Sequence, residues 1–296
     1  MPIFLARSGY PRASFPTRSR YKPPALLRWW HVASCDAPTV AVVWTLSFAR
    51  AAGVRLPLWV PLLVALGTWW VYVADRVLDA RRAMLSGSAE TLRERHFFHW
   101  RYRRVLVPAA ACAVIVSAAI VCSRMSASVR EHDSVLAIAA LAYFSGVHVP
   151  GQRPQWVGQL WSKELLVGIL FTAGCAAPTL TRLRAISGDH TAIILLVLAM
   201  GCYAALAWLN CLAIDRWESA RAFDVAWPAG LIAAGAILLA LASAPRDMGL
   251  ALLLAACAAS ALLLGLLHRQ RDRLTPLASR CAADLVLLTP LICLMR

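Results

Sequence analysis

The sequence has 296 residues, of which 60% are hydrophobic and only 15% are charged, and its mean hydropathy is +0.63. This composition excludes an ordinary soluble domain, because the surface of such a domain needs far more polar sequence. The net charge of +15 does not indicate nucleic-acid binding here, since the basic residues lie between apolar runs, where they set topology and contact lipid head groups.

The first thirty residues contain no acidic residue and are rich in Arg, Pro and Ser. Residues 1–30 are therefore predicted to form a disordered, basic, cytoplasmic tail. An organelle transit peptide has a similar composition, so that alternative stays open. The nine cysteines are scattered without a C-x-x-C pair, and we interpret them as small apolar core residues.

Residues 31–296 are predicted to form an all-α, polytopic membrane domain, because runs of nearly 20 apolar residues follow one another. Nine transmembrane helices are expected, near residues 33–50, 56–74, 105–123, 134–150, 163–180, 191–214, 225–245, 248–267 and 281–295. Eight or ten spans remain open, because the first and last runs each contain an acid, Asp36 and Asp284. An acid inside a span is a functional candidate by default, although both of these lie near a span end, where they can reach water.

Most of the 30 Lys and Arg residues fall on the N-terminal tail and on the loops of the same side. This bias predicts a cytoplasmic N-terminus and an odd number of spans, in an integral protein of the inner (cytoplasmic) membrane.

Two copies of the pattern D-R-x-x-x-A-R end apolar runs, beginning at Asp75 and at Asp215. Helical spacing places Asp75 with Asp79 on one face, and Asp215 with Glu218 on another. One interpretation is that these four acids bind Mg²⁺, which prefers carboxylate oxygens and commonly bridges them to substrate phosphates. The arginines of the two patterns would hold the remaining phosphate charge. The structural alternative is that each Asp pairs with its own neighbouring Arg at the membrane edge.

The motifs resemble those of the UbiA superfamily of intramembrane prenyltransferases. Members have nine helices, with N-D-x-x-D-x-x-x-D after helix two and a second motif, commonly D-x-x-x-D, after helix six. In this sequence Val71, Tyr72, Asp75 and Asp79 occupy the N, D, D and D positions. In the second motif Cys211 and Asp215 have the D-x-x-x-D spacing, and Asn210 precedes them. A Tyr near the end of helix four (Tyr143) and the residues that open helix five (Lys163 onward) are also similar.

The resemblance implies an enzyme that moves an isoprenyl group from its diphosphate to a lipophilic acceptor with Mg²⁺. Asp75, Asp79 and Asp215 would then be catalytic. The implied substrate-binding residues are Arg76, Arg81, Tyr143, Lys163, Asn210, Arg216, Glu218 and Arg221.

The replacement of family acids by Tyr72 and Cys211 keeps two alternatives open. One is a catalytically inactive relative that binds lipid or diphosphate, and the other is a small-solute transporter built from two similar halves. The acceptor, the prenyl chain length and the oligomeric state are not determined by the sequence.

Residues 91–104 have few helix breakers and alternate aromatic residues with Arg. They are predicted to form an interfacial amphipathic helix that contacts membrane lipid. His96 and His99 form an H-x-x-H pattern within it, for which we favour this helix over a zinc site, since no third ligand is nearby in the sequence.

Overall fold

The computed structural model describes residues 21–87, 92–131, 133–135, 138–139, 163–186, 189–219 and 222–295. Apart from one isolated β-bridge between Tyr21 and Leu274, the regular secondary structure of these residues is helical, as predicted. Seven of their helices are long and apolar enough to cross a membrane, and a bent helix pair makes an eighth span if it is counted as one. The chain is thus an all-α, multi-pass membrane protein.

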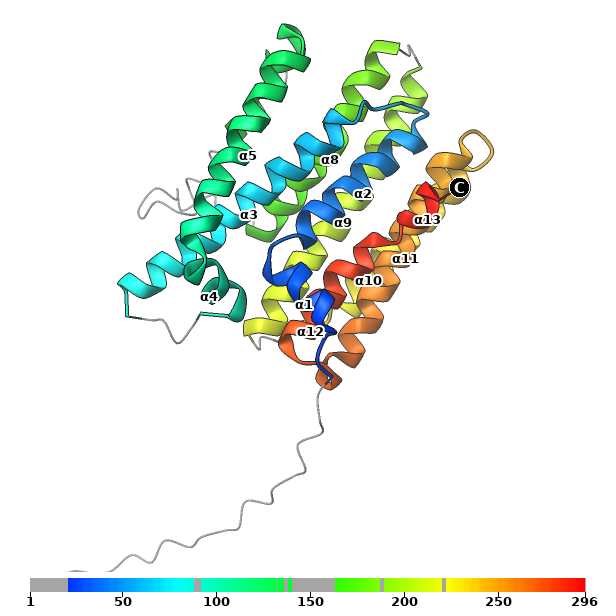
Figure 1. The fold of residues 1–296 in the computed structure, drawn as a ribbon. Coiled ribbons are helices and arrows are strands. Elements are labelled where there is room, and N and C mark those ends of the chain that lie inside the picture. Colours follow the sequence, from blue (N-terminus) through cyan, green and yellow to red (C-terminus); the bar gives the residue numbers. More distant parts are fainter. Residues whose placement is uncertain are drawn as a thin grey trace, which may run out of the picture.

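Figure 1 shows the order of the helices along the chain. They are α1 (Ala25–Val32), α2 (Asp36–Ala51), α3 (Trp59–Leu85), α4 (Glu94–Arg101), α5 (Arg103–Arg124), α8 (Lys163–Ile186), α9 (His190–Ser219), α10 (Ala226–Ser243), α11 (Met248–Gln270), α12 (Pro276–Leu285) and α13 (Leu291–Leu294). Two short 3-10 turns, η2 (Arg271–Arg273) and η3 (Val286–Leu288), precede and follow α12. The seven candidate spans fall on predicted ones, whereas the span predicted near 134–150 lies almost entirely outside the described residues.

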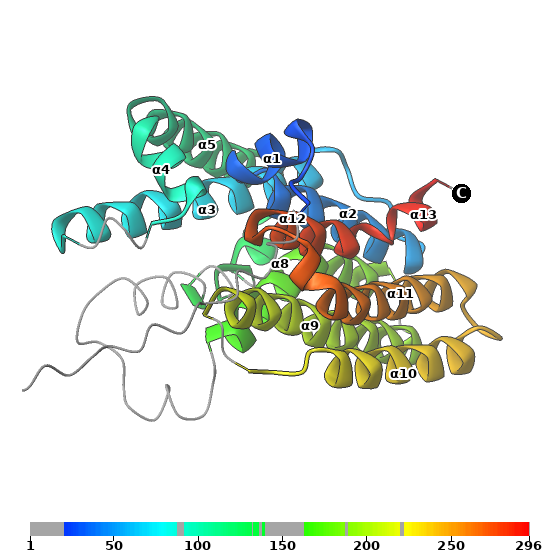
Figure 2. The same cartoon turned by 90° about the horizontal axis from the view of Figure 1, so that it is seen from below.

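Helix α2 lies at the centre of the bundle, and α3, α8 and α11 pack against it (Figures 1 and 2). Val40, Trp44 and Phe48 repeat every four residues along one buried face. The Trp44 ring stacks on Tyr203 of α9 with 3.7 Å between ring centroids. Its indole N–H also donates to the carbonyl oxygen of Leu287 at 2.9 Å, so this one side chain joins α2, α9 and η3.

The outer helices differ from α2 in how little of them the protein covers. Along α5, which lies at one edge of the bundle (Figure 1), Ala113 is buried while Val105 and Ile115 are exposed. Exposed apolar residues on a helix of this length and hydropathy are suited to contact with lipid.

The packing between α8 and α9 is close, because a Cβ at Gly168 would lie 2.7 Å from the backbone nitrogen of Trp208.

One end of the bundle collects α1, α4, α12 and the C-terminal ends of α3 and α9, and we call it the α4 end (Figures 1 and 2). Helices α1 and α2 meet there at 86°. The chain turns between them at Ser34, whose φ of 55° lies in the left-handed region. The bend folds α1 back beside the start of α2.

Two predicted boundaries are corrected at this end. Residues 21–30 do not belong to a disordered tail: Tyr21 exchanges backbone hydrogen bonds with Arg273 and Thr275 at 2.9 and 3.0 Å, and α1 begins at Ala25. Composition averaged over thirty residues hid the apolar segment from Ala25 onward. The span predicted near 56–74 extends to Leu85 in α3, so Asp75 and Asp79 lie on its last turns, and α4 follows before α5.

Candidate functional site

The two acids of α3 lie beside basic side chains. An Asp75 carboxylate oxygen is 2.5 Å from the Arg76 guanidinium, and an Asp79 oxygen is 4.0 Å from Nε2 of His96 on α4. The pairing of Asp75 with its own neighbour is the structural alternative named from the sequence.

Glu218 of α9 is the acid on which most arginines converge. It forms ion pairs with Arg93, Arg95 and Arg280, which come from the start of α4 and from α12. Asp215, one turn earlier, lies near Arg93: burial lowers the pKa of Arg93, and the charge of Asp215 opposes that shift. The second acidic pattern is therefore neutralised by arginines far away in the sequence.

These contacts bear directly on the predicted Mg²⁺ site. Within the described part of the chain, His31, Asp36 and Asp284 form the metal-capable group whose ligand atoms lie within 4.8 Å of one another. None of Asp75, Asp79, Asp215 and Glu218 belongs to that group. Arginines lie beside two of the four predicted ligands, Arg76 beside Asp75 and Arg93 and Arg280 beside Glu218, so the Mg²⁺ site stays a prediction.

The predicted substrate-binding residues are divided between the site and the surface. Arg76 is half-buried and Asn210 is buried, whereas Arg81 and Lys163 are exposed. The Arg216 guanidinium lies over the Phe223 ring, 6.0 Å from its centroid. Tyr143 and Arg221 lie outside the described residues.

A small, partly open cavity lies between the two motif helices. It has a volume of about 40 Å³ and is lined by Tyr72 of α3, Asn210 and Cys211 of α9, and Asp284 of α12. Apolar side chains of α2, α8 and η3 complete its wall. A buried water needs about 10–15 Å³, so the cavity has room for small polar groups but not for a prenyl chain. Tyr72 and Cys211, which stand where the two family motifs have acids, thus line the same cavity.

Polar atoms that lack hydrogen bonds surround this cavity. Asn210 is 5% exposed, and its side-chain oxygen has no hydrogen-bond partner among the described residues. Tyr203 also lines the cavity, and its buried hydroxyl likewise has no hydrogen-bond partner among the described residues. Buried polar groups without partners are costly, and they commonly mark a place where water or a ligand binds.

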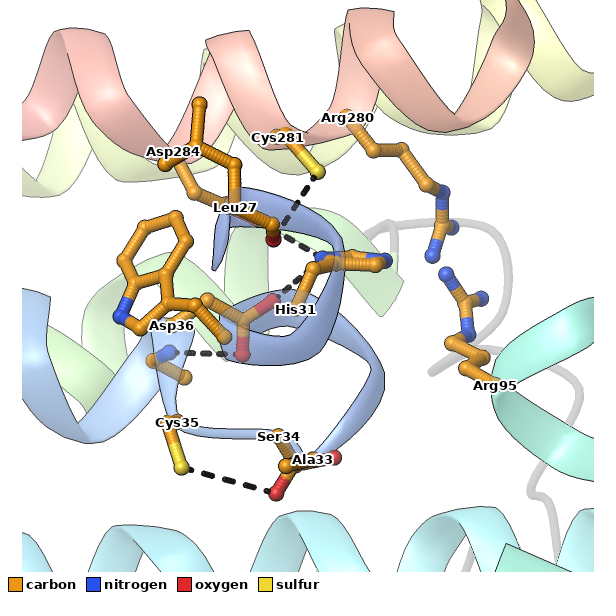
Figure 3. A network of polar contacts seen from close by, with 12 residues as sticks. Leu27, His31, Ala33, Ser34, Cys35, Asp36, Arg95, Arg280, Cys281 and Asp284 are labelled. Carbon is orange, nitrogen blue, oxygen red and sulfur yellow. Dashed lines mark hydrogen bonds and ion pairs between the residues drawn. The ribbon is translucent and has the colours of Figure 1, made fainter. Parts of the chain in front are cut away.

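Asp284 also belongs to a second polar group, the trio of His31, Asp36 and Asp284 (Figure 3). His31 lies in the last turn of α1, and its Nδ1 is 2.6 Å from an Asp36 oxygen and 3.5 Å from an Asp284 oxygen. The other oxygen of Asp36 accepts the backbone N–H of Ala37 at 2.9 Å. A carboxylate is favourable at a helix N-terminus, which fixes Asp36 at the start of α2.

Arginines border the trio on the side facing α4. Figure 3 shows the Arg95 and Arg280 guanidinium groups pointing into the same region beside His31. We define the arginine cluster as Arg76, Arg93, Arg95 and Arg280. The Nε atoms of Arg76 and Arg95 are buried and have no hydrogen-bond partner among the residues described, whereas Nε of Arg280 faces the Glu218 carboxylate. Guanidinium groups with spare donors are suited to bidentate binding of carboxylate or phosphate.

The two histidines of α4 are buried and hold this helix in place. His99 places Nδ1 2.8 Å from the carbonyl oxygen of Arg95 and Nε2 3.3 Å from the Ser34 hydroxyl. Burial and nearby arginines lower the pKa of His96 and of His99 to about 4. Neither residue belongs to a metal-capable group in the described ranges, so the H-x-x-H pattern has a structural explanation.

Three residues of the site were not selected from the sequence: His31, Arg95 and Arg280. Their signal was weak: Arg280 stands just before the span predicted near 281–295, and Asp36 and Asp284 are acids inside apolar runs. Such acids are functional candidates in membrane proteins. His31 carried no signal, because it stands at the predicted boundary between tail and membrane domain.

Comparison with known proteins gives no match to a family model, a curated protein or a solved structure. The UbiA resemblance therefore rests on the motif positions and the helix order of this chain.

Proposed function

We propose that this protein is a UbiA-like membrane prenyltransferase that binds an isoprenyl diphosphate at the α4 end and transfers its isoprenyl group to a lipophilic acceptor. The observation that carries the proposal is the shared cavity: Tyr72 from the first motif and Asn210 and Cys211 from the second line one space beside the arginine cluster.

The arginine cluster, which lies outside the lining of the cavity, favours an anionic head group. Arg93, Arg95 and Arg280 converge on a single carboxylate, that of Glu218, so the local charge is positive before any ligand binds. A diphosphate would accept hydrogen bonds from the spare guanidinium N–H groups of these side chains. In the transfer step the same arginines would stabilise the negative charge that develops on the departing diphosphate.

The cavity also supplies groups for the organic part of the ligand. The aromatic rings of Tyr72, Phe171 and Tyr203 line it, and such rings stabilise an allylic cation through their π faces. The Asp284 carboxylate, also in the cavity wall, would accept the proton released by the acceptor. A prenyl chain needs more than the present volume, so its binding requires the apolar wall at Val167 and Leu287 to open.

A second candidate is a non-catalytic protein that binds the same phosphorylated lipid. It is favoured by the ion pairs of Asp75 with Arg76 and of Glu218 with three arginines, because acids neutralised in this way are withdrawn from metal-assisted chemistry. The two candidates share a ligand and differ in whether diphosphate is released.

The test is thermal unfolding of the purified protein in detergent with geranylgeranyl diphosphate, farnesyl diphosphate, inorganic diphosphate or geranylgeraniol. A prenyl diphosphate is expected to stabilise the protein by about 2.7 kcal/mol at a hundredfold excess over its Kd. The alcohol should have a much smaller effect. Arg95→Gln should remove the stabilisation, whereas Arg81→Gln, which changes an exposed Arg of the same motif region, should retain it.

No stabilisation by either prenyl diphosphate would contradict the proposal. Stabilisation without release of diphosphate, in the presence of a range of quinol and phenol acceptors, would favour the non-catalytic candidate.

A further inference from the structure

The trio of His31, Asp36 and Asp284 has the composition and spacing of a metal site. Its three ligand atoms come from α1, α2 and α12 and lie within 4.8 Å of one another. The His31 and Asp284 atoms are 3.5 Å apart. Ligands of a tetrahedral ion with bonds near 2.1 Å stand about 3.4 Å apart, so the Asp36 carboxylate alone would have to withdraw from His31 to admit an ion.

A second observation points to a ligand at the same place. His31 is 4% exposed, and its Nδ1 atom lies 2.6 Å from an Asp36 oxygen and 3.5 Å from an Asp284 oxygen. The two carboxylates belong to two other helices, α2 and α12, and they converge on the same ring nitrogen. A buried imidazole nitrogen that faces two carboxylate oxygens is arranged as a metal ligand is.

The charges of the trio suit a divalent ion. Two carboxylates and a neutral imidazole carry a charge of −2, which a divalent cation neutralises. Arg95 and Arg280 lie close by (Figure 3) and would repel a cation, but both form ion pairs with Glu218. A bound ion would therefore be neutralised by Asp36 and Asp284, while Glu218 neutralises the arginines.

We propose that His31, Asp36 and Asp284 bind one divalent transition-metal ion of the Mn²⁺ or Zn²⁺ class. Imidazole together with carboxylate favours these ions, whereas Mg²⁺ prefers oxygen ligands alone. Because Asp284 also lines the cavity, a free coordination position would face the space occupied by Tyr72 and Cys211. The site brings a carboxylate to the place where the resemblance expects motif acids, and it does not depend on prenyl transfer being the function.

Mn²⁺ is the sharper probe, because it binds nitrogen and oxygen ligands in preference to the thiols of the nine cysteines. The protein is purified in detergent without a polyhistidine tag, stripped of metal, and titrated with Mn²⁺ while the free ion is followed by electron paramagnetic resonance. We expect one site per chain, and we expect Asp36→Asn, Asp284→Asn and His31→Gln each to weaken it by more than about tenfold. Glu94→Gln is the matched control, since Glu94 is an exposed acid at the same end of the bundle and lies outside the trio.

Two controls distinguish the loss of a metal ligand from misfolding. The first is the unfolding midpoint of each metal-free variant. The second is Asp284→Glu, which keeps the charge but moves the carboxylate. Mn²⁺ should raise the midpoint of the unchanged protein and of Glu94→Gln, and not that of Asp284→Asn. Absence of Mn²⁺ binding, or equal binding by the three trio variants and the control, would overturn the inference. A prenyl diphosphate that still stabilises a protein without metal binding would leave the proposed function standing.

Discussion

Replacing Glu218 by Gln tests whether the arginines at the α4 end depend on one buried carboxylate. The side chains of Glu218, Arg95 and Arg280 are 12%, 10% and 12% exposed, so the substitution leaves two buried guanidinium groups without their acid. Breaking a buried pair on one side costs roughly 3–5 kcal/mol. Arg93 adds little to this, because its side chain is 40% exposed and water screens the pair.

A matched surface pair provides the control. Arg28 and Glu94 also form an ion pair at the α4 end, but their side chains are 54% and 42% exposed. Glu94→Gln is therefore expected to cost at most about 1 kcal/mol. Both variants are measured by reversible unfolding in mixed micelles with increasing dodecyl sulfate, against the unchanged protein under the same conditions.

The double variant Glu218→Gln with Arg280→Gln sharpens the result. Its cost should be smaller than the sum of the two single costs, because the second change removes the charge that the first left alone. Equal destabilisation by Glu218→Gln and Glu94→Gln, or strict additivity in the double variant, would refute the assignment of Glu218 as the shared partner of buried arginines.

Three further predictions concern packing, pH and a helix cap. Gly168→Ala should destabilise the protein by about 1–3 kcal/mol, since its Cβ would lie 2.7 Å from backbone of α9. Gly174→Ala in the same helix meets nothing within 4 Å and should be neutral or mildly stabilising in the same unfolding titration. His96 and His99 have folded-state pKa values near 4, below about 6.5 in the unfolded chain. Stability should therefore be complete above pH 6.5 and fall between pH 6.5 and 4, by roughly 1–2 kcal/mol per residue after solvent screening. The fall should shrink in His96→Gln and in His99→Gln, and an unchanged pH profile in both would contradict this assignment. Asp247→Ala should cost about 1 kcal/mol because the Asp247 side chain accepts the Leu250 N–H at 2.9 Å at the start of α11; Asp247→Asn, which keeps an acceptor, should cost less.

The sequence by itself determined the all-α membrane class and the approximate position of the long helices. Hydrophobicity is a property of each segment, so a run such as 248–267 predicts a spanning helix without knowledge of its neighbours. Helical spacing likewise identified the charged ends of α3 and α9, including Asp75 and Glu218. Sequence reasoning could not fix the break between α1 and α2, because it depends on Ser34 adopting a left-handed conformation that Gly or Asn adopts far more readily.

The tertiary structure alone decided which charges meet. Glu218 pairs with Arg93 and Arg280, and His31 meets Asp284, across large separations in the chain. A sequence shows where a charge stands along a helix, but an ion pair or a metal-capable group depends on a distance of a few ångströms between helices. That distance is set by how α1 folds back, how α4 docks through His99, and where α12 enters beside α9, and these follow from the packing of the whole bundle.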